Sequence, residues 1–433
     1  MAHDAMKPRL VGGPGYAPLS EGTIRPFLLE LPHLAARLGG PADAWSIREV
    51  GDGNLNLVFI VKGPDDGLVI KQALPYLRLI GEGWPLPLER AFFEHEALLI
   101  QANLAPRSVP TVYHFDRELA AVVMELLEPH IILRKGLIQG IVYPKLALHM
   151  ARFAASTLFG TSDLACPAAV KRERQALFSR NLELCKITED LVFTDPYRIA
   201  PMNRCTSPQL DGIAARFRSD GALKVAVQEL KWIFLSRGEA LIHGDLHTGS
   251  VMVTGQDTRI IDPEFACIGP IGFDLGAFMA NLLLAYFSQP GHASPADDRR
   301  AYGEWILQEL EAFWNGFEAN FLALWRQGGA GDAFAGGLFD DPAARGELEG
   351  FRKLFLARVF NDSLGFAGAK MARRILGLAH VEDLESITDL ELRAQCEIKA
   401  LQLARVLMVE RAGVSSVAEL STLARQICSS SRS

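Results

Sequence analysis

At 433 residues, the chain is too long for one compact core of ordinary size, so its length predicts two or three domains or lobes. Hydrophobic residues make up 49% and charged residues 22%, which is typical of a soluble globular protein and excludes long disorder or collagen-like repeats. The formal net charge of −7 offers no global attraction to nucleic acid or to an anionic membrane. Any anionic ligand therefore needs a local site.

The six cysteines are scattered and form no C-x-x-C pair, which argues against a zinc ribbon or a disulfide scaffold and favours reduced thiols. The N-terminus has no apolar core of the signal-peptide type, and the longest apolar stretch, 275–287, spans 13 residues and includes Asn281. These features predict a cytoplasmic protein that has neither a membrane nor a nucleic acid as its partner.

After an irregular, glycine- and proline-rich lead-in, the pattern predicts a small lobe of four strands and one helix. The strands are short runs rich in β-branched residues, and turn residues separate the first two, which predicts an antiparallel hairpin. In chain order, the expected elements are strands 57–61 and 67–71, a helix over 87–100, and strands 110–115 and 120–125.

From Lys145 onward most segments have a helical pattern, with a β-like island at 241–261. A small α+β lobe is thus expected to precede a large helical lobe. We divide the chain into an irregular lead-in (1–20), an N-terminal lobe (21–127) and a C-terminal helical lobe (128–433).

The densest chemical signal is a polar loop around Asp245 that lies between two apolar runs and is expected to join two short strands. Asp262 follows 17 residues later at the end of another β-like run, and Glu264 is two positions further on. Residues two apart in an extended segment point to the same side, so these two carboxylates can jointly hold a hard cation such as Mg²⁺. Three carboxylates on loop ends suit phosphoryl transfer, in which one orients a hydroxyl and the others hold metal against phosphate oxygens.

Each motif alone has an ordinary explanation, because Asp245 can cap a turn and Asp262 can begin a helix. Both motifs together at this spacing favour the chemical interpretation. His243 and His247 stand four residues apart but lack the H-E-x-x-H pattern of a helical zinc pair. We interpret them as structural hydrogen-bonding residues.

A glycine-containing segment, 51–56, precedes the first strand and is able to approach phosphate closely, although a plain hairpin turn is the simpler explanation by itself. Neither a Rossmann fingerprint nor a P-loop occurs in the chain. Lys71 ends an apolar strand, so its ammonium needs an anionic partner if it points inward. Glu96 in the following helix is the expected partner, and Glu94, on a different helix face, is the alternative.

The order of these features resembles the aminoglycoside-phosphotransferase-like kinases, which are relatives of protein kinases. Within that group the chain is similar to the methylthioribose kinases, over roughly residues 49–384. The residues that carry this likeness are Gly51-Asp52-Gly53-Asn54-Leu55-Asn56, the tryptophan segment 78–86, Asp245-Leu246-His247-Thr248-Gly249-Ser250 and Asp262-Pro263-Glu264. The resemblance implies a bilobal protein-kinase-like fold, with a small antiparallel sheet and a helix in the N-terminal lobe and a large, mostly helical C-terminal lobe.

The resemblance also implies roles for the carboxylates. Asp245 would be the catalytic base and would orient the sugar 1-hydroxyl, and it therefore also counts as a substrate-binding residue. Asp262 and Glu264 would hold Mg²⁺ and, with Pro263 between them, the ATP phosphates. Asp274 matches the residue that fixes the catalytic loop from the following helix.

The remaining nucleotide contacts follow from the same likeness. Lys71, braced by Glu96, would contact the α- and β-phosphates of ATP. The other ATP contacts fall on the glycine turn and on the interlobe hinge, whose backbone would read the adenine edge, and they are Asn54, Glu125, Leu126 and Leu127.

Substrate recognition is assigned to Arg373 and Arg374, which resemble a twin arginine that reaches into the sugar site of these kinases. Arginine can donate several hydrogen bonds to vicinal hydroxyls and can steady charge on a transferring phosphoryl group. Without the resemblance, a solvated helix face is the preferred interpretation. Ser250 stands where many relatives have a metal-binding Asn, which puts a metal role for this position in doubt.

The resemblance therefore implies transfer of the γ-phosphoryl group of ATP to the 1-hydroxyl of 5-methylthioribose, in methionine salvage, by a homodimer that uses Mg²⁺. The alternatives are a related kinase for an aminoglycoside, choline, homoserine or another sugar, and a nucleotide-binding pseudokinase or scaffold. The arginine pair argues against a cationic acceptor.

Overall fold

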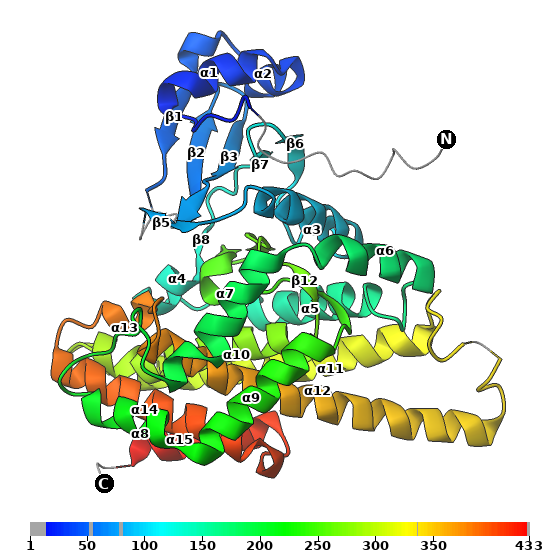
Figure 1. Ribbon diagram of the computed structural model, residues 1–433, viewed down its shortest axis with the longest axis vertical. Coiled ribbons are helices and arrows are strands. Elements are labelled where there is room, and N and C mark those ends of the chain that lie inside the picture. Colours follow the sequence, from blue (N-terminus) through cyan, green and yellow to red (C-terminus); the bar gives the residue numbers. More distant parts are fainter. Residues whose placement is uncertain (1–13, 52–54, 78–80, 336, 431–433) are drawn as a thin grey trace. The chain divides into compact units, whose positions relative to one another are not determined.

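The computed structural model describes residues 14–51, 55–77, 81–335 and 337–430 (Figure 1). By its internal contacts the chain divides into two compact units. Unit 1 comprises Met1–Glu128 together with the short segment Asp262–Phe265, and unit 2 comprises Pro129–Ile261 and Ala266–Ser433. The metal-ligand motif predicted from the sequence therefore groups with the N-terminal unit, although both of its flanks belong to the other unit.

Unit 1 is a five-stranded antiparallel sheet with helices, in the strand order β1-β2-β3-β7-β6. A separate two-stranded ribbon pairs β4 with β5. Its elements are α1 (Glu21–Leu29), α2 (Pro32–Leu38), the 3₁₀ turn η1 (Ala42–Ala44), β1 (Ser46–Glu49), β2 (Asn56–Lys62), β3 (Gly67–Ala73), β4 (Tyr76–Leu77), β5 (Gly81–Pro85), α3 (Arg90–Leu104), β6 (Val112–Asp116) and β7 (Ala121–Glu125).

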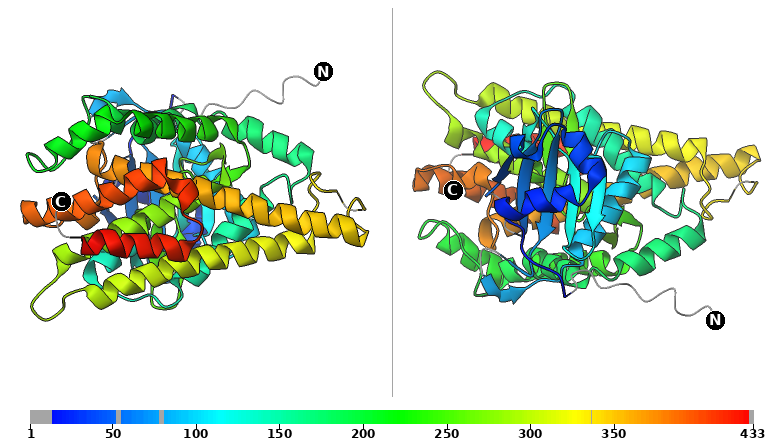
Figure 2. Two further views of the ribbon diagram at one scale, coloured as in Figure 1. Left: turned by 90° about the horizontal axis from the view of Figure 1, so that it is seen from below. Right: turned by 90° about the horizontal axis from the view of Figure 1, so that it is seen from above.

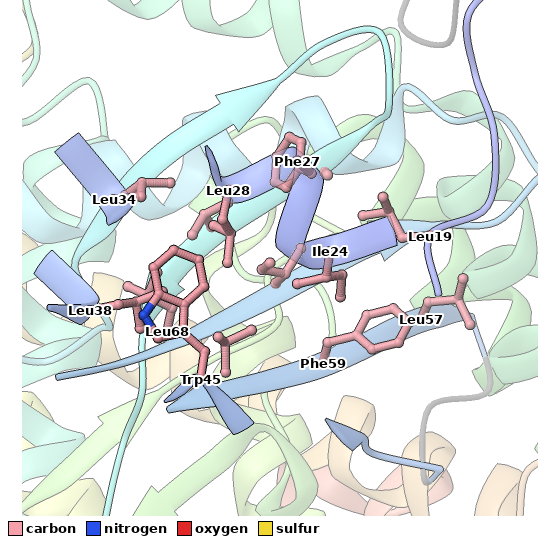
Figure 3. Close-up of a cluster of buried hydrophobic side chains, with 14 of the residues drawn as sticks. Leu19, Ile24, Phe27, Leu28, Leu34, Leu38, Trp45, Leu57, Phe59 and Leu68 are labelled. Carbon is pink, nitrogen blue, oxygen red and sulfur yellow. The ribbon is translucent and has the colours of Figure 1, made fainter. Parts of the chain in front are cut away.

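The predicted hairpin is confirmed, since β2 and β3 pair antiparallel with Phe59 opposite Ile70. The predicted helix and the two later strands are also present as α3, β6 and β7, with boundaries shifted by at most four residues. Strand β3 shows why Lys71 turns away from the apolar core. Leu68 and Ile70 belong to the apolar cluster of unit 1, in which Figure 3 labels Leu68. Alternation along a strand puts Lys71 on the opposite face of the sheet, where α3 packs.

Helices α1 and α2 were not predicted, because Pro26 and Pro32 interrupt the pattern. Pro32 begins α2, where proline is tolerated, whereas Pro26 lies inside α1. Together the two helices bury a set of aliphatic and aromatic side chains against one face of the sheet (Figure 3), namely Ile24, Phe27, Leu28, Leu34 and Leu38.

Unit 2 is mostly helical and contains two small antiparallel sheets, β11-β10-β8 and β12-β9. Its elements are β8 (Ile131–Ile132), α4 (Leu133–Gln139), α5 (Leu146–Gly160), α6 (Ala168–Phe178), α7 (Leu182–Phe193), η2 (Asp195–Tyr197), α8 (Asp211–Ser219), α9 (Gly221–Ser236), β9 (Ala240–Ile242), η3 (Thr248–Ser250), β10 (Val251–Val253), β11 (Thr258–Ile260), β12 (Cys267–Gly269), α10 (Ile271–Ser288), η4 (Gln289–His292), α11 (Arg300–Gln327), α12 (Pro342–Leu376), α13 (Glu382–Glu385), α14 (Leu390–Val409), η5 (Arg411–Gly413) and α15 (Val417–Ser429). The expected β-like island is thus confirmed as short strands, and the α+β fold class is confirmed with it.

Helix α10 forms the centre of unit 2 and is buried along its whole length. Gly276 lets it approach α12 closely, since a Cβ atom there would lie 2.5 Å from the Ser363 carbonyl oxygen. Among the described residues, Ile271–His292 is long and apolar enough to cross a membrane, but it is a wholly buried core helix. Helices α11 and α12 lie side by side (Figures 1 and 2) and interlock through aromatic pairs such as Trp325 with Phe355.

Candidate active site

Unit 1 gathers one lysine and three carboxylates under its sheet. Lys71 Nζ lies 2.8 Å from a carboxylate oxygen of Glu94 and also bonds Asp262 Oδ1. One carboxylate oxygen from each of Glu94, Asp262 and Glu264 lies within 4.8 Å of the others. The predicted metal-ligand pair therefore comes together and is joined by a third carboxylate that the sequence analysis did not include in the metal site.

The lysine partner is Glu94, which corrects the expectation that Glu96 would brace Lys71. Glu94 belongs to the buried stripe of α3, four residues after Arg90 and three before Ala97. Glu96 is turned about 200° around the helix from Glu94, is partly exposed and contacts His95 at 3.1 Å. The helical stripe in the sequence was the signal that could have separated the two glutamates.

Arg90 is a second cation of this cluster and was missed by the sequence analysis. Its side chain is fully buried, and its Nε lies 3.4 Å from Glu264 Oε2. Asn56, at the start of β2, donates from Nδ2 to the same Glu264 oxygen at 3.0 Å. Glu264 is thereby held by two side chains from different elements, which fixes its orientation.

Asp262 has a left-handed backbone, with φ of +69°. Aspartate and asparagine tolerate this region better than most other non-glycine residues. This conformation ends the strand geometry right after β11. The carboxylates of Asp262 and Glu264 therefore come together through a turn, and not through the extended segment that was expected. A backbone in a sparsely populated region is a common feature of functional sites.

The charges of this cluster do not balance, because two cations, Lys71 and Arg90, face three carboxylates. Burial, with Asp262 and Glu264 nearby, raises the pKa of Glu94 to about 7 despite the Lys71 ammonium, and burial also raises the pKa of Glu264. Burial alone would lower the pKa of Lys71, but Asp262 and Glu94 outweigh it and raise that pKa. An all-oxygen donor set with one negative charge in excess fits a hard divalent cation.

In unit 2, the loop that carries Asp245 lies between β9 and the 3₁₀ turn η3. Asp274, in the first turn of α10, accepts hydrogen bonds from the backbone N–H groups of His243 (2.6 Å) and Gly244 (3.0 Å). His243 Nδ1 accepts from the Asp245 N–H, so its Nε2 carries the proton and donates to the Ile261 carbonyl at 2.9 Å. Asp274 therefore fixes the loop as the resemblance implied, and His243 is a structural histidine as predicted.

The Asp245 carboxylate is held at both oxygens. Lys370 Nζ donates to Oδ1 at 3.0 Å, His247 Nε2 lies 3.2 Å from Oδ2, and Arg374 Nη2 lies 3.6 Å from Oδ2. Burial would raise the pKa of Asp245, but Lys370, His247 and Arg374 together hold it well below its usual range. Asp245 is therefore an ionised acceptor at neutral pH.

His247 is a neutral donor. Its Nδ1 accepts the Gly249 N–H at 3.0 Å, which leaves the proton on Nε2, where it points to Asp245. Burial lowers the pKa of His247 to about 4, although Asp245 opposes that shift. The Ser250 hydroxyl is buried and donates to the Asp245 carbonyl at 3.1 Å, so a bond within its own loop occupies its proton.

The twin arginine lies at the end of α12 and is buried, which excludes a solvated helix face. Arg374 contacts Asp245 and donates from Nη1 to the Ala379 carbonyl at 3.3 Å. Arg373 has two buried donors, Nε and Nη1, without a hydrogen-bond partner in the part of the chain that the structure describes, whereas for Arg374 this holds only for Nε. Unpartnered buried donors of this kind are expected to serve a ligand.

The remaining predicted site residues belong to the glycine turn, the hinge, the 262–265 segment and the tryptophan segment. Asn54 lies outside the described residues. At the expected hinge, the Glu125 N–H donates to the Thr111 carbonyl at 2.9 Å, and the assignment of this backbone to the adenine edge stays a prediction. Leu126 and Leu127 follow the end of β7, and Pro263 lies within the 262–265 segment. Trp84 lies near the end of β5.

Residues 46–313 match the sequence profile of the phosphotransferase enzyme family, and this span is more than half of the chain. The chain therefore belongs to the phosphotransferase enzyme family. Methylthioribose kinase 1 of Oryza sativa subsp. japonica is 49% identical over 409 residues, which cover 94% of this chain and 94% of that protein. The methylthioribose kinase of Escherichia coli O45:K1 (strain S88 / ExPEC) is 46% identical over 396 residues, or 91% of this chain and 94% of that protein.

Within the phosphotransferase family, the chain belongs with the methylthioribose kinases and is a kinase enzyme. Among solved structures, a glucosamine kinase (crystal form A) aligns over 89% of this chain and 83% of that chain, with a TM-score of 0.47 and 12% identity.

Proposed function

We propose that the protein transfers the γ-phosphoryl group of ATP to the 1-hydroxyl of 5-methylthioribose and so forms 5-methylthioribose 1-phosphate. The observation that carries this proposal is the ionised Asp245, held by Lys370 and His247 beside the buried twin arginine. The substrate follows from the names of relatives that are 46–49% identical over more than 90% of the chain.

The nucleotide is assigned to the unit 1 cluster. Lys71 carries the ammonium for the α- and β-phosphates, and Glu94 keeps it in place. Asp262 and Glu264 would hold Mg²⁺, which when bound neutralises phosphate oxygens during transfer. The one negative charge in excess in this cluster and the raised pKa of Glu94 support the assignment, because a divalent cation would relieve both.

The acceptor hydroxyl is assigned to Asp245. A carboxylate whose pKa is held well below its usual range is a weak base, so it serves first as a hydrogen-bond acceptor that orients the hydroxyl. This suits phosphoryl transfer through a loose transition state, in which positioning matters more than early deprotonation. Asp245 then takes the proton as the new oxygen–phosphorus bond completes.

Arg373 is assigned to the sugar or to the transferring phosphoryl group, on the strength of its two buried donors without partners. Arg374 already contacts Asp245 and is assigned to holding that carboxylate. An Arg373→Ala variant is therefore expected to raise KM for the sugar, whereas Arg374→Ala lowers kcat. Equal effects of the two variants on both constants would contradict this division.

A cationic acceptor such as choline or an aminoglycoside is disfavoured. Three cations of α12, Lys370, Arg373 and Arg374, lie around the carboxylate of Asp245, so positive charge exceeds negative charge in this group of residues. A group of that sign favours an uncharged sugar and an anionic phosphoryl group.

The test is direct. Purified protein with ATP and Mg²⁺ would be given methylthioribose, with choline, homoserine and an aminoglycoside in parallel, and the phosphorylated acceptor would be followed by ³¹P NMR. A phosphorylated acceptor should form only with methylthioribose, as its 1-phosphate, and the absence of this product while ATP still binds would refute the substrate. Asp245→Asn should lower kcat by about 10²- to 10⁴-fold and leave ATP affinity unchanged.

We also propose a cytoplasmic homodimer. A homodimer agrees with the sequence-based expectation, and cytoplasmic placement agrees with reduced thiols at all six cysteines, none of which forms a disulfide. Light scattering on the full chain tests the oligomeric state, since a mass of one 47.4 kDa subunit at assay concentration would contradict the dimer.

A further inference from the structure

Lys370 is a buried cation to which neither the sequence pattern nor the family resemblance assigned a role. It lies on α12, one turn before the twin arginine, and is 3% exposed. Its Nζ donates to Asp245 Oδ1 at 3.0 Å and lies 4.5 Å from the centre of the Phe273 ring. The ammonium thus forms an ion pair with Asp245 and lies against an aromatic face.

Three buried cations on one face of α12 cost folding free energy, which a purely structural role for this helix would not explain. Lys370, Arg373 and Arg374 occupy positions i, i+3 and i+4, so they share one face of α12, and all three are buried. Like charges at this spacing repel each other, and burial adds a desolvation cost for each. The negative end of the helix dipole offsets part of this for the two arginines in the last turn.

We propose that Lys370 is a positioning residue, which holds the Asp245 carboxylate in one orientation and keeps it ready to accept the hydrogen bond of the acceptor hydroxyl. The inference rests on the proposed role of Asp245 and adds to it the group that orients that carboxylate.

The lone pairs of the carboxylate show how this orientation works. Each carboxylate oxygen offers about two acceptor positions. Lys370 takes one on Oδ1 and His247 takes one on Oδ2, and Arg374 approaches Oδ2 at the longer distance of 3.6 Å. With both oxygens tethered, the carboxylate cannot rotate about its Cβ–Cγ bond, and an acceptor position on Oδ1 stays open toward a hydroxyl.

The main charged and titratable groups around Asp245 come from α12 and from its own loop. From α12 these are Lys370, Arg373 and Arg374, and from the loop it is the neutral His247. Arg134 of α4 acts on His247 and the arginines, and Asp274 of α10 interacts with Lys370. Lys370 is the strongest of the attractive charges that oppose the effect of burial on the pKa of Asp245. Loss of its charge therefore raises the pKa of Asp245.

The experiment compares Lys370→Met with Lys171→Met as a matched control. Lys171 is also a buried lysine of unit 2, but its ammonium bonds Asp163 and the Glu239 carbonyl instead of Asp245. For K370M we expect kcat at neutral pH to fall by about ten- to a hundredfold, with KM for ATP unchanged. The acid limb of the kcat–pH profile should move upward by about one to three pH units.

K171M should lower thermal stability without moving the acid limb. If K370M does not fold, Lys370→Gln removes the charge but keeps a donor, and the same upward movement of the acid limb is expected. Lys370→Arg, which keeps the charge, should leave the acid limb in place. An acid limb that stays at the wild-type pH in K370M or K370Q, or that moves equally in K171M, would overturn the proposal.

Asp245→Asn separates this inference from the proposed function. If D245N retains turnover, the role of Asp245 is wrong and the proposed mechanism fails with it. If D245N is inactive while K370M keeps the wild-type kcat and pH profile, the mechanism stands and the positioning role of Lys370 is refuted.

Discussion

His247 makes the stability of unit 2 depend on pH in a direction that the structure fixes. Its pKa is lowered from 6.5 in the unfolded chain to about 4 in the folded protein. The unfolded chain therefore takes up the proton first, so acidification favours unfolding. The contribution of neutral His247 to the free energy of unfolding is complete above pH 6.5 and is lost as the pH falls from 6.5 toward 4.

The magnitude follows from these two pKa values. At pH 5 the protonation factor is (1 + 10^1.5) for the unfolded chain and (1 + 10^−1) for the folded protein, a ratio of about 30, which corresponds to about 2 kcal/mol. We expect the free energy of unfolding of the wild type to fall by about 2 kcal/mol more between pH 8 and pH 5 than that of a His247→Gln variant.

Urea unfolding followed by tryptophan fluorescence measures this difference, because Trp314 and Trp325 are buried in unit 2. The other histidines are present in both proteins, so their contributions cancel in the comparison. Equal pH dependence in wild type and H247Q would refute the reasoning, and so would a steeper loss in the variant.

Three further predictions concern single positions. Glu94→Gln should lower kcat/KM for ATP by at least about tenfold, because the Lys71 ammonium loses its buried carboxylate, whereas Glu96→Gln should stay close to wild type in the same assay. Ser250→Ala should leave the Mg²⁺ concentration for half-maximal rate unchanged, and a raised requirement would show that its hydroxyl serves the metal. Gly276→Ala should destabilise the protein by about 1–3 kcal/mol in urea unfolding, because its Cβ would lie 2.5 Å from the α12 backbone. The control Gly350→Ala, which meets nothing within 4 Å in an exposed helix, should be neutral or stabilising, and destabilisation equal to that of G276A would contradict this account.

Local sequence patterns were enough to predict the central hairpin, α3 and the short strands around Asp245. The hydrophobic period and the turn residues determine such elements locally. The need of Lys71 for an anionic partner, if its side chain points inward, also followed from its strand. The helical period could have decided between Glu94 and Glu96 as the partner of Lys71. Glu94 lies on the same buried side of α3 as Arg90 and Ala97.

Long-range pairings could not be predicted in the same way. Lys370 is 125 residues from Asp245, and nothing in its neighbourhood in the sequence indicates which carboxylate it meets. Three cations near the end of a helix usually indicate a solvated face, so their burial follows only from the packing of α12 in unit 2. Arg90 was missed for the same reason, because its partner Glu264 lies far away in the chain.

The left-handed backbone at Asp262 affects how this position can be studied and how it can vary. Alanine there would remove the carboxylate and also strain the turn, so a lost activity would have two causes that no rate measurement separates. Asparagine accepts the same backbone and keeps nearly the same shape, and it removes only the charge. Position 262 therefore admits few residues for conformational reasons alone, and a comparison of Asp262→Asn with Asp262→Ala by thermal melting measures the backbone component apart from the chemistry.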